Sequence, residues 1–358
     1  MRNFVIMLIL ILILAYFSFP QEIIENPEKP LSKNAGRTLK LEEVLRITDE
    51  SGDFYFRYPQ DLKIAPDGSI FFRDEEQILK FSPEGEFVKN FYKKGQGPGE
   101  ISGWNFPFAF YNDEIYVFDN NPRKIIHFNN VGNLIEEFSF RSEDYRGFYG
   151  VVDGCFVFSK TIYPPVEERK PKLHDIKHLI FLVYSDGKVK KESSVFPVKQ
   201  FLGPNYGKSW ASFYAAISWD NKYLYVSHAC EYEIDLLDIN KGVVIRSFYR
   251  KYPRIKYKMK YPGEEEFDKK HNAPKKKFED DVFGLYLCKG NLWVETSTKD
   301  KNKGDLFDVF NEQGQFVDSF YIDLKGSLLA VYEDTIFVKE TDEEENIQIV
   351  KYKIKDDT

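Results

Sequence analysis

Cysteine, histidine and methionine are all scarce in this chain of 358 residues. It contains three cysteines, five histidines and three methionines. The cysteines, at positions 155, 230 and 288, are odd in number and far apart, which excludes the disulfide framework of a small exported domain. We expect them to be buried free thiols, with a role for Cys230 beside His228 and Glu231 as the alternative. So few histidines allow no Ser–His–Asp or Cys–His catalytic arrangement to be assigned.

A strong excess of either charge is also missing. The chain has 50 basic and 57 acidic residues and a net charge of −7, which argues against a general nucleic-acid-binding protein. Aromatic residues are abundant instead, with 33 Phe and 23 Tyr. These side chains suit the half-buried surface of β-strands and fill the space between packed sheets.

The N-terminus carries the one long apolar run. Arg2 precedes an apolar stretch from Phe4 to Phe17 that continues to Pro20, as in a secretory signal peptide. The 16 residues 4–19 would span about 24 Å as a helix, short of the ~30 Å hydrocarbon core. We therefore expect residues 1–20 to direct export to the periplasm, the cell surface or the medium. A retained membrane anchor over residues 4–19 is the alternative, because no small-x-small cleavage pair precedes Gln21.

Six short aromatic-aliphatic segments recur, each ending in one polar side chain at the same register. They are Ile70–Asp74, Ile115–Asp119, Cys155–Ser159, Leu224–His228, Leu292–Thr296 and Ile336–Glu340. Their first residues lie 45, 40, 69, 68 and 44 positions apart. A period near 45 is typical of the four-stranded blade of a β-propeller. We predict an all-β fold, a six-bladed β-propeller with four-stranded antiparallel blades, over residues 37–358.

The last repeat is one strand short. It ends with the strand-like segment Ile347–Ile354, after which only four residues remain. We expect the N-terminal segment Leu39–Ile47 to supply the missing strand and to close the ring, leaving no long open edge. Residues 21–36, which contain prolines and mixed charges, are predicted to be a flexible linker.

Two insertions interrupt the period. The first, 161–178, is rich in proline and charge and lies within the third repeat; the second, 250–281, separates the fourth and fifth repeats. Residues 250–277 contain eleven Lys or Arg and four Asp or Glu, a local charge of +7. We interpret this segment as a solvated loop or short helix, with a docking surface for an anionic polymer or head group as the alternative.

Three motifs carry a resemblance to a known family. They are Ala65–Asp74, the turn Ser82–Gly85 and the stretch Lys94–Glu100, which contains Gly-Gln-Gly-Pro-Gly. Together they resemble the six-bladed propellers of the NHL and NHL-like group, in particular an exported bacterial branch. The third and fourth repeats depart from the family pattern, since they lack the Asp after the second strand. Such propellers host binding, scaffolding, hydrolase and lyase activities alike, so the resemblance implies a fold more than a function.

The polar residues that end the six repeated segments are the candidate ligand-binding site. They are Asp74, Asp119, Ser159, His228, Thr296 and Glu340. In a propeller they would lie on one face of the disc around the central opening, where they could bind a polar ligand or a divalent cation. Alternatively, each side chain caps its own hairpin by accepting backbone N–H groups. We assign no metal ligand, and a divalent cation is the one cofactor that the pattern brings into consideration.

We therefore predict an exported binding module rather than an enzyme. Its ligand would be a protein, a peptide or a carbohydrate held on one face of the disc, with no nucleic-acid partner and with membrane attachment only through the N-terminal segment. The alternative is a metal-dependent hydrolase of the lactonase type, or a lyase, that uses the central polar ring.

Overall fold

The computed structural model describes residues 21–103, 106–140, 145, 147–259 and 261–355. Their regular structure is β-strand apart from the helix α2 (Glu264–His271) and the 3-10 turn η1 (Val166–Glu168). The predicted signal peptide or anchor, residues 1–20, lies outside this range. Among the helices of the described residues, none is long and apolar enough to span a membrane.

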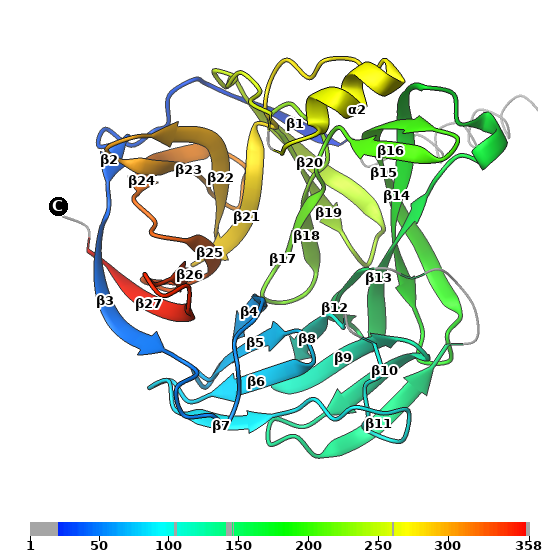
Figure 1. The fold of residues 1–358 in the computed structure, drawn as a ribbon, viewed down its shortest axis with the longest axis vertical. Coiled ribbons are helices and arrows are strands. Elements are labelled where there is room, and N and C mark those ends of the chain that lie inside the picture. Colours follow the sequence, from blue (N-terminus) through cyan, green and yellow to red (C-terminus); the bar gives the residue numbers. More distant parts are fainter. Residues whose placement is uncertain (1–20, 104–105, 141–144, 146, 260, 356–358) are drawn as a thin grey trace, which may run out of the picture.

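The strands of the described residues form six sheets, numbered here in chain order (Figure 1). Sheet 1 contains β4 (Pro59–Ile64), β5 (Ile70–Asp74), β6 (Gln77–Phe81) and β7 (Phe87–Asn90). Sheet 2 contains β8 (Phe108–Tyr111), β9 (Glu114–Asn120), β10 (Arg123–Phe128) and β11 (Leu134–Ser139). Sheet 3 contains β12 (Gly147–Val152), β13 (Cys155–Ile162), β14 (Lys172–Val183), β15 (Val189–Gly203) and β16 (Tyr206–Ser209).

The other three sheets each take up a strand from the N-terminal region. Sheet 4 contains β17 (Tyr214–Ile217), β18 (Tyr223–Ser227), β19 (Glu233–Asp238), β20 (Val243–Arg250) and β1 (Glu22–Asn26). Sheet 5 contains β21 (Val282–Cys288), β22 (Asn291–Asp300), β23 (Gly304–Phe310), β24 (Phe316–Ile322) and β2 (Arg37–Thr38). Sheet 6 contains β25 (Ser327–Tyr332), β26 (Thr335–Thr341), β27 (Ile347–Lys355) and β3 (Lys40–Ile47).

The repeated segments of the sequence are the second strands of the sheets. In β5 all five residues are buried, because the sheet packs against a neighbouring sheet on each face. Phe72 belongs to the cluster shared with sheet 6, and Phe71 to the cluster shared with sheet 2. A strand covered on both faces reads as a continuous apolar run rather than as an alternating one. This explains why these segments are the clearest signal in the sequence.

Six apolar clusters join the sheets, one between each consecutive pair. The cluster between the last sheet and the first contains Ile47 and Phe337 from sheet 6 and Phe56 and Phe72 beside or within sheet 1. The first strands of neighbouring sheets also touch, as β25 does with β4 and with β21. The sheets therefore follow one another around a ring, in the manner of a β-propeller (Figure 1).

The N-terminal strand occupies the predicted place. β3 pairs antiparallel with β27, in a register that sets Lys40 opposite Lys355 and Ile47 opposite Ile349. The first and last parts of the chain thus share sheet 6. The three cysteines are free and buried, as their scarcity and spacing predicted.

The predicted linker over residues 21–36 is wrong for much of its length. β1 pairs in parallel with β20, from Glu22 beside Arg246 to Asn26 beside Arg250. Further along, the N–H groups of Leu31 and Ser32 donate to carbonyls of the β24 edge at 3.1 and 2.9 Å. The outer strands of sheets 4 and 5 present unpaired backbone groups, and this segment satisfies them.

Candidate functional site

The six polar residues that end the repeated segments of the sequence are all buried. Their exposed fractions range from 0% for Asp74 and Asp119 to 8% for His228. Five of them lie within the second strands of their sheets, and His228 directly follows β18. Their hydrogen-bond partners decide what each of them does.

Asp74 and Asp119 cap the loops that lead into the first strands of their sheets. Asp74 accepts the N–H groups of Arg57 at 2.8 Å and Tyr58 at 2.7 Å, directly before β4. Asp119 accepts those of Ser102 at 2.7 Å, Gly103 at 2.9 Å and, within its own turn, of Asn121 at 3.1 Å. Both carboxylates are fully buried, and both oxygens of each are engaged. These contacts correspond to capping.

Three more members of the column also have partners within their own sheets. The hydroxyl of Thr296 donates to the Leu306 carbonyl at 3.0 Å. Glu340 accepts the hydroxyl of Tyr352 at 2.5 Å and lies 3.4 Å from the guanidinium of Arg46. The Ser159 hydroxyl forms a hydrogen bond with the hydroxyl of Tyr149. Burial raises the pKa of Tyr149 to about 12, against the opposing effect of this bond.

For the acidic members of the ring, these contacts favour the capping alternative over ligand binding. Among the described residues, one group of His, Asp and Glu side chains is close enough to hold a metal ion. Asp74, Asp119 and Glu340 do not belong to it. Local backbone and side-chain partners occupy these carboxylates instead. The sequence register could not show this, because the capped N–H groups of Arg57 and Tyr58 lie 17 and 16 residues before Asp74.

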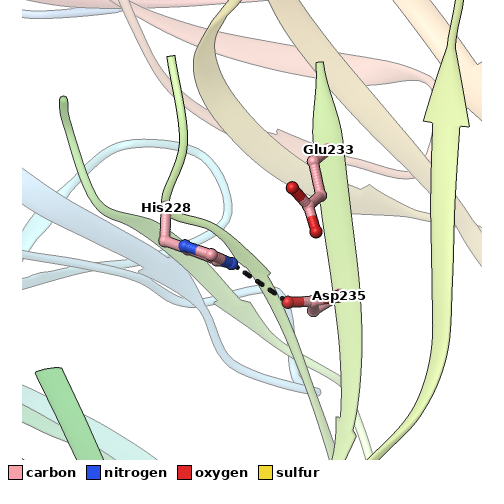
Figure 2. A group of neighbouring side chains, drawn as sticks. All are labelled: His228, Glu233 and Asp235. Carbon is pink, nitrogen blue, oxygen red and sulfur yellow. Dashed lines mark hydrogen bonds and ion pairs between the residues drawn. The ribbon is translucent and has the colours of Figure 1, made fainter. Parts of the chain in front are cut away.

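His228 differs from the other five, because it meets two carboxylates of β19 (Figure 2). It follows the last residue of β18, and the side chains of Glu233 and Asp235 point toward it from the next strand. Its Nε2 lies 3.2 Å from Oδ2 of Asp235, and its Nδ1 lies 3.0 Å from the carbonyl oxygen of Pro197 in β15. One ligand atom from each of the three residues falls within 4.8 Å of the others. We call these three residues the histidine cluster.

Neighbouring hydroxyl groups orient both acids of the histidine cluster. The Ser247 hydroxyl donates to Oδ1 of Asp235, and the Tyr249 hydroxyl donates to Oε1 of Glu233 at 2.8 Å. Burial lowers the pKa of His228, but the bonds to Asp235 and the Pro197 carbonyl outweigh it and raise that pKa above its ordinary value. Burial and the bond to Glu233 raise the pKa of Tyr249 to about 12.

Sequence reasoning identified His228 but missed Glu233 and Asp235. A signal for them exists, since acidic residues stand at alternate positions of an otherwise apolar strand, Glu-Ile-Asp-Leu-Leu-Asp. Alternation places both on one face of β19. That face turns toward sheet 3, because the next residue on it, Leu237, packs in the cluster between sheets 3 and 4.

The second insertion is anchored to sheet 3 by its acidic side chains. Lys208 of β16 lies 2.8 Å from Glu264 and 2.8 Å from Asp268, both on α2, which lies beside β16 in Figure 1. The hydroxyl of Tyr257 donates to the buried Glu264 at 2.6 Å. Phe267 adds an edge-on contact with Tyr206, their ring centres 5.9 Å apart.

The acidic residues at the end of the insertion also point inward. Asp280 pairs with Lys276 at 2.7 Å, and Asp281 pairs with Arg254 at 2.9 Å. Glu279 accepts the N–H of Lys258 at 3.0 Å. All three acids are buried, and burial raises the pKa of Asp281 to about 6 against the opposing effect of Arg254.

Most lysines of the same insertion are exposed, although Lys276 pairs inward with Asp280 and the acids Glu265 and Glu266 are exposed as well. We call the basic surface the exposed set Lys256, Lys258, Lys270, Lys275 and Lys277. Backbone bonds join its two ends, since Tyr257 donates to the Lys277 carbonyl at 3.0 Å and Lys256 forms a bridge with Phe278. Large apolar side chains stand exposed among these lysines: Met259 at 59%, Tyr261 at 52% and Phe278 at 37%.

No family model and no curated protein matches this sequence. The fold, by contrast, is similar to solved structures. A candidate exported protein from Bacteroides fragilis aligns with a TM-score of 0.53 and 13% identity, over 93% of this chain and 100% of that one. A member of the DUF4221 family from Bacteroides vulgatus aligns with a TM-score of 0.52 and 15% identity, over 89% of this chain and 99% of that one.

A gluconolactonase from Xanthomonas campestris aligns less well, with a TM-score of 0.45 and 13% identity over 90% of this chain and 98% of that one. At sequence identities this low, the structural similarity describes a shared arrangement of strands and not a shared chemistry at any site.

Proposed function

We propose that the chain is an exported six-bladed β-propeller of the NHL-like type and that it binds an anionic polysaccharide on the basic surface. Six sheets joined in a ring and the blade motif Ala65–Asp74 support the blade assignment. The apolar run near the N-terminus and the fold shared with a candidate exported protein support export. One observation carries the binding role: four acids of the second insertion, Glu264, Glu279, Asp280 and Asp281, are buried, whereas the five lysines of the basic surface are exposed.

The distribution of charge favours a polyanion that binds at one place. The whole chain has a net charge of −7 and residues 250–277 have a charge of +7, so the remainder has −7 − 7 = −14. A polyanion is repelled by most of this molecule and attracted by the insertion, which directs it to the basic surface. Lysine ammonium groups act there as mobile point charges that suit sulfate or carboxylate groups along a flexible chain.

The exposed aromatic side chains favour a carbohydrate among the polyanions. Tyr261 and Phe278 are 52% and 37% exposed, and they present apolar rings beside the lysines. A sugar ring offers apolar C–H faces and polar edges, so it can contact an aromatic ring while its acidic substituents meet ammonium groups.

The alternative, a metal-dependent hydrolase or lyase in the central ring, has less support. Such chemistry needs several oxygen ligands around one ion. Asp74 and Asp119, the acids that the alternative requires, already accept two and three backbone N–H groups respectively.

Titration with dextran sulfate and with uncharged dextran tests the proposal. We expect the protein to bind dextran sulfate and not uncharged dextran. Replacing all five lysines of the basic surface by glutamine should weaken binding at least about tenfold, because the local positive potential is lost. Equal binding of both polymers would contradict the proposal.

A matched variant controls for the total change in charge. Five exposed lysines elsewhere, replaced by glutamine together, remove the same charge without touching the insertion: Lys188, Lys190, Lys289, Lys301 and Lys325. We expect this variant to bind dextran sulfate as the unaltered protein does. If both variants lose the same affinity, the attraction is not localised at the basic surface.

A further inference from the structure

We propose that the histidine cluster, His228, Glu233 and Asp235, is a binding site for Zn²⁺ or a similar transition-metal dication. The site lies between sheets 3 and 4, and the proposal does not depend on the proposed polysaccharide. Three observations support this proposal. They are the tautomer that the Pro197 carbonyl imposes on His228, the spacing of the donor atoms, and the hydrogen bonds that neighbouring residues form with each ligand.

The carbonyl of Pro197 fixes the tautomer of His228. A carbonyl oxygen can only accept, so Nδ1 at 3.0 Å must carry the hydrogen. The other nitrogen, Nε2, then faces Oδ2 of Asp235 at 3.2 Å. If neutral, it would present its lone pair to a carboxylate, which is repulsive. A cation must therefore occupy this place, either a proton on Nε2 or a metal ion that both atoms bind.

The donor spacing suits a metal ion. Zinc binds nitrogen and carboxylate oxygen at about 2.0–2.2 Å, so two donors at tetrahedral angles lie roughly 3.4 Å apart. Nε2 and Oδ2 are separated by 3.2 Å, close to that value. One carboxylate oxygen of Glu233 lies within 4.8 Å of the other two donors.

Each ligand has a partner on its far side, as in known metal centres. Pro197 holds Nδ1 of His228, Ser247 donates to the second oxygen of Asp235, and Tyr249 donates to Glu233. Outer partners of this kind fix the orientation of metal ligands and are part of their affinity. Neutral His228 with the two carboxylates has a charge of −2, which a divalent ion cancels.

The donor set points to the zinc class of ions. One imidazole with two carboxylates suits Zn²⁺, Co²⁺ or Ni²⁺, whereas Mg²⁺ and Ca²⁺ prefer sites made of oxygen alone. Glu233 is only partly buried, while the other two ligands are buried.

Calorimetric titration of the EDTA-treated protein with Zn²⁺ tests this site. We expect one Zn²⁺ per chain and a rise of the melting temperature, since an ion that binds the native state stabilises it. Mg²⁺ should produce neither effect. His228→Asn and Glu233→Gln should each weaken Zn²⁺ binding at least about tenfold. Glu233→Gln is the safer variant for folding, because its side chain is the least buried of the three.

His127→Gln provides the matched control. His127 is also buried and contacts two carboxylates, Glu114 at 2.7 Å and Glu136 at 3.4 Å, but these do not form a three-residue group with it. We expect this variant to bind Zn²⁺ as the unaltered protein does. The proposal is overturned if no saturable binding occurs at millimolar Zn²⁺, or if binding is lost with His127 and kept in both cluster variants.

Discussion

At the scale of single residues, the imidazole of His178, in β14 of sheet 3, lies in an environment that disfavours its charged form. Its Nδ1 lies 3.1 Å from the hydroxyl of Thr161, and its ring lies 3.9 Å from that of Phe213. Its Nε2 is buried, with no hydrogen-bond partner among the described residues. Burial lowers the pKa of His178 to about 4, because the charged ring would be poorly solvated.

This lowered pKa predicts a loss of stability in acid. The unfolded chain takes up the proton near the ordinary pKa of about 6.5, before the folded protein does, so stability is complete above that pH and falls as the pH approaches 4. Between pH 7 and pH 4.5 the unaltered protein should lose about 2–3 kcal/mol relative to His178→Phe, which cannot titrate. Urea unfolding at both pH values measures it. The same change in both proteins would contradict the assignment.

Also at the scale of single residues, replacing Asp119 distinguishes a capping role from a ligand-binding role. In Asp119→Ala three backbone N–H groups lose their acceptor, so we expect unfolding to become easier by about 1–3 kcal/mol in urea. Binding of dextran sulfate should be unchanged at temperatures where the variant is folded. A variant of unchanged stability that no longer binds its ligand would restore the ligand-binding interpretation of the column.

The strand repeat identified the six polar residues in the sequence but not their hydrogen-bond partners. Their register follows from the strand repeat, which is local in the chain. Their partners come from loops 16 or 17 residues away for Asp74, and from another sheet for His228, whose ring meets Pro197 of β15. Contacts of this kind exist only after the sheets have assembled.

At the scale of elements, β1 shows why a short strand could not be predicted from the composition of its segment. Glu22–Asn26 contains two isoleucines, but it stands beside prolines and charges that favour a linker. Its partner is the edge of β20, and Ile24 packs on the cluster between sheets 4 and 5. The pairing depends on an edge more than 200 residues away, as in the contact of Arg246 with Glu22.

Removing residues 21–36 should therefore destabilise the protein. A chain that begins at Arg37 lacks β1 and the bonds of Leu31 and Ser32 to the β24 edge. We expect a lower melting temperature than for a chain that begins at Gln21, by roughly 2–4 °C for each kcal/mol lost. Identical melting curves would show that the segment behaves as a free linker.

At the scale of the whole molecule, the ring depends on a strand from the beginning of the chain. β3 completes sheet 6, and Ile47 at its end packs in the cluster that joins sheet 6 to sheet 1. The sequence predicted this closure, because the sixth repeat is one strand short and the unpaired segment Leu39–Ile47 has the pattern of a strand.

Truncation beyond Arg46 should unfold the entire domain. It removes almost all of β3 and exposes the edge of β27 together with the last apolar cluster. We expect the shortened chain to lose its cooperative thermal transition in calorimetry. If it keeps a sharp transition, the ring does not need this strand.

Also at the whole-molecule scale, an acidic protein concentrates positive charge on one insertion, since residues 250–277 have a local charge of +7. The most direct test is the salt dependence of dextran sulfate binding, measured for the unaltered protein and for the variant with five glutamines in the basic surface. Each ion contact adds to the slope of log affinity against log salt concentration. We predict a steep slope for the unaltered protein and a clearly smaller one for the variant. The same slope for both would contradict the account.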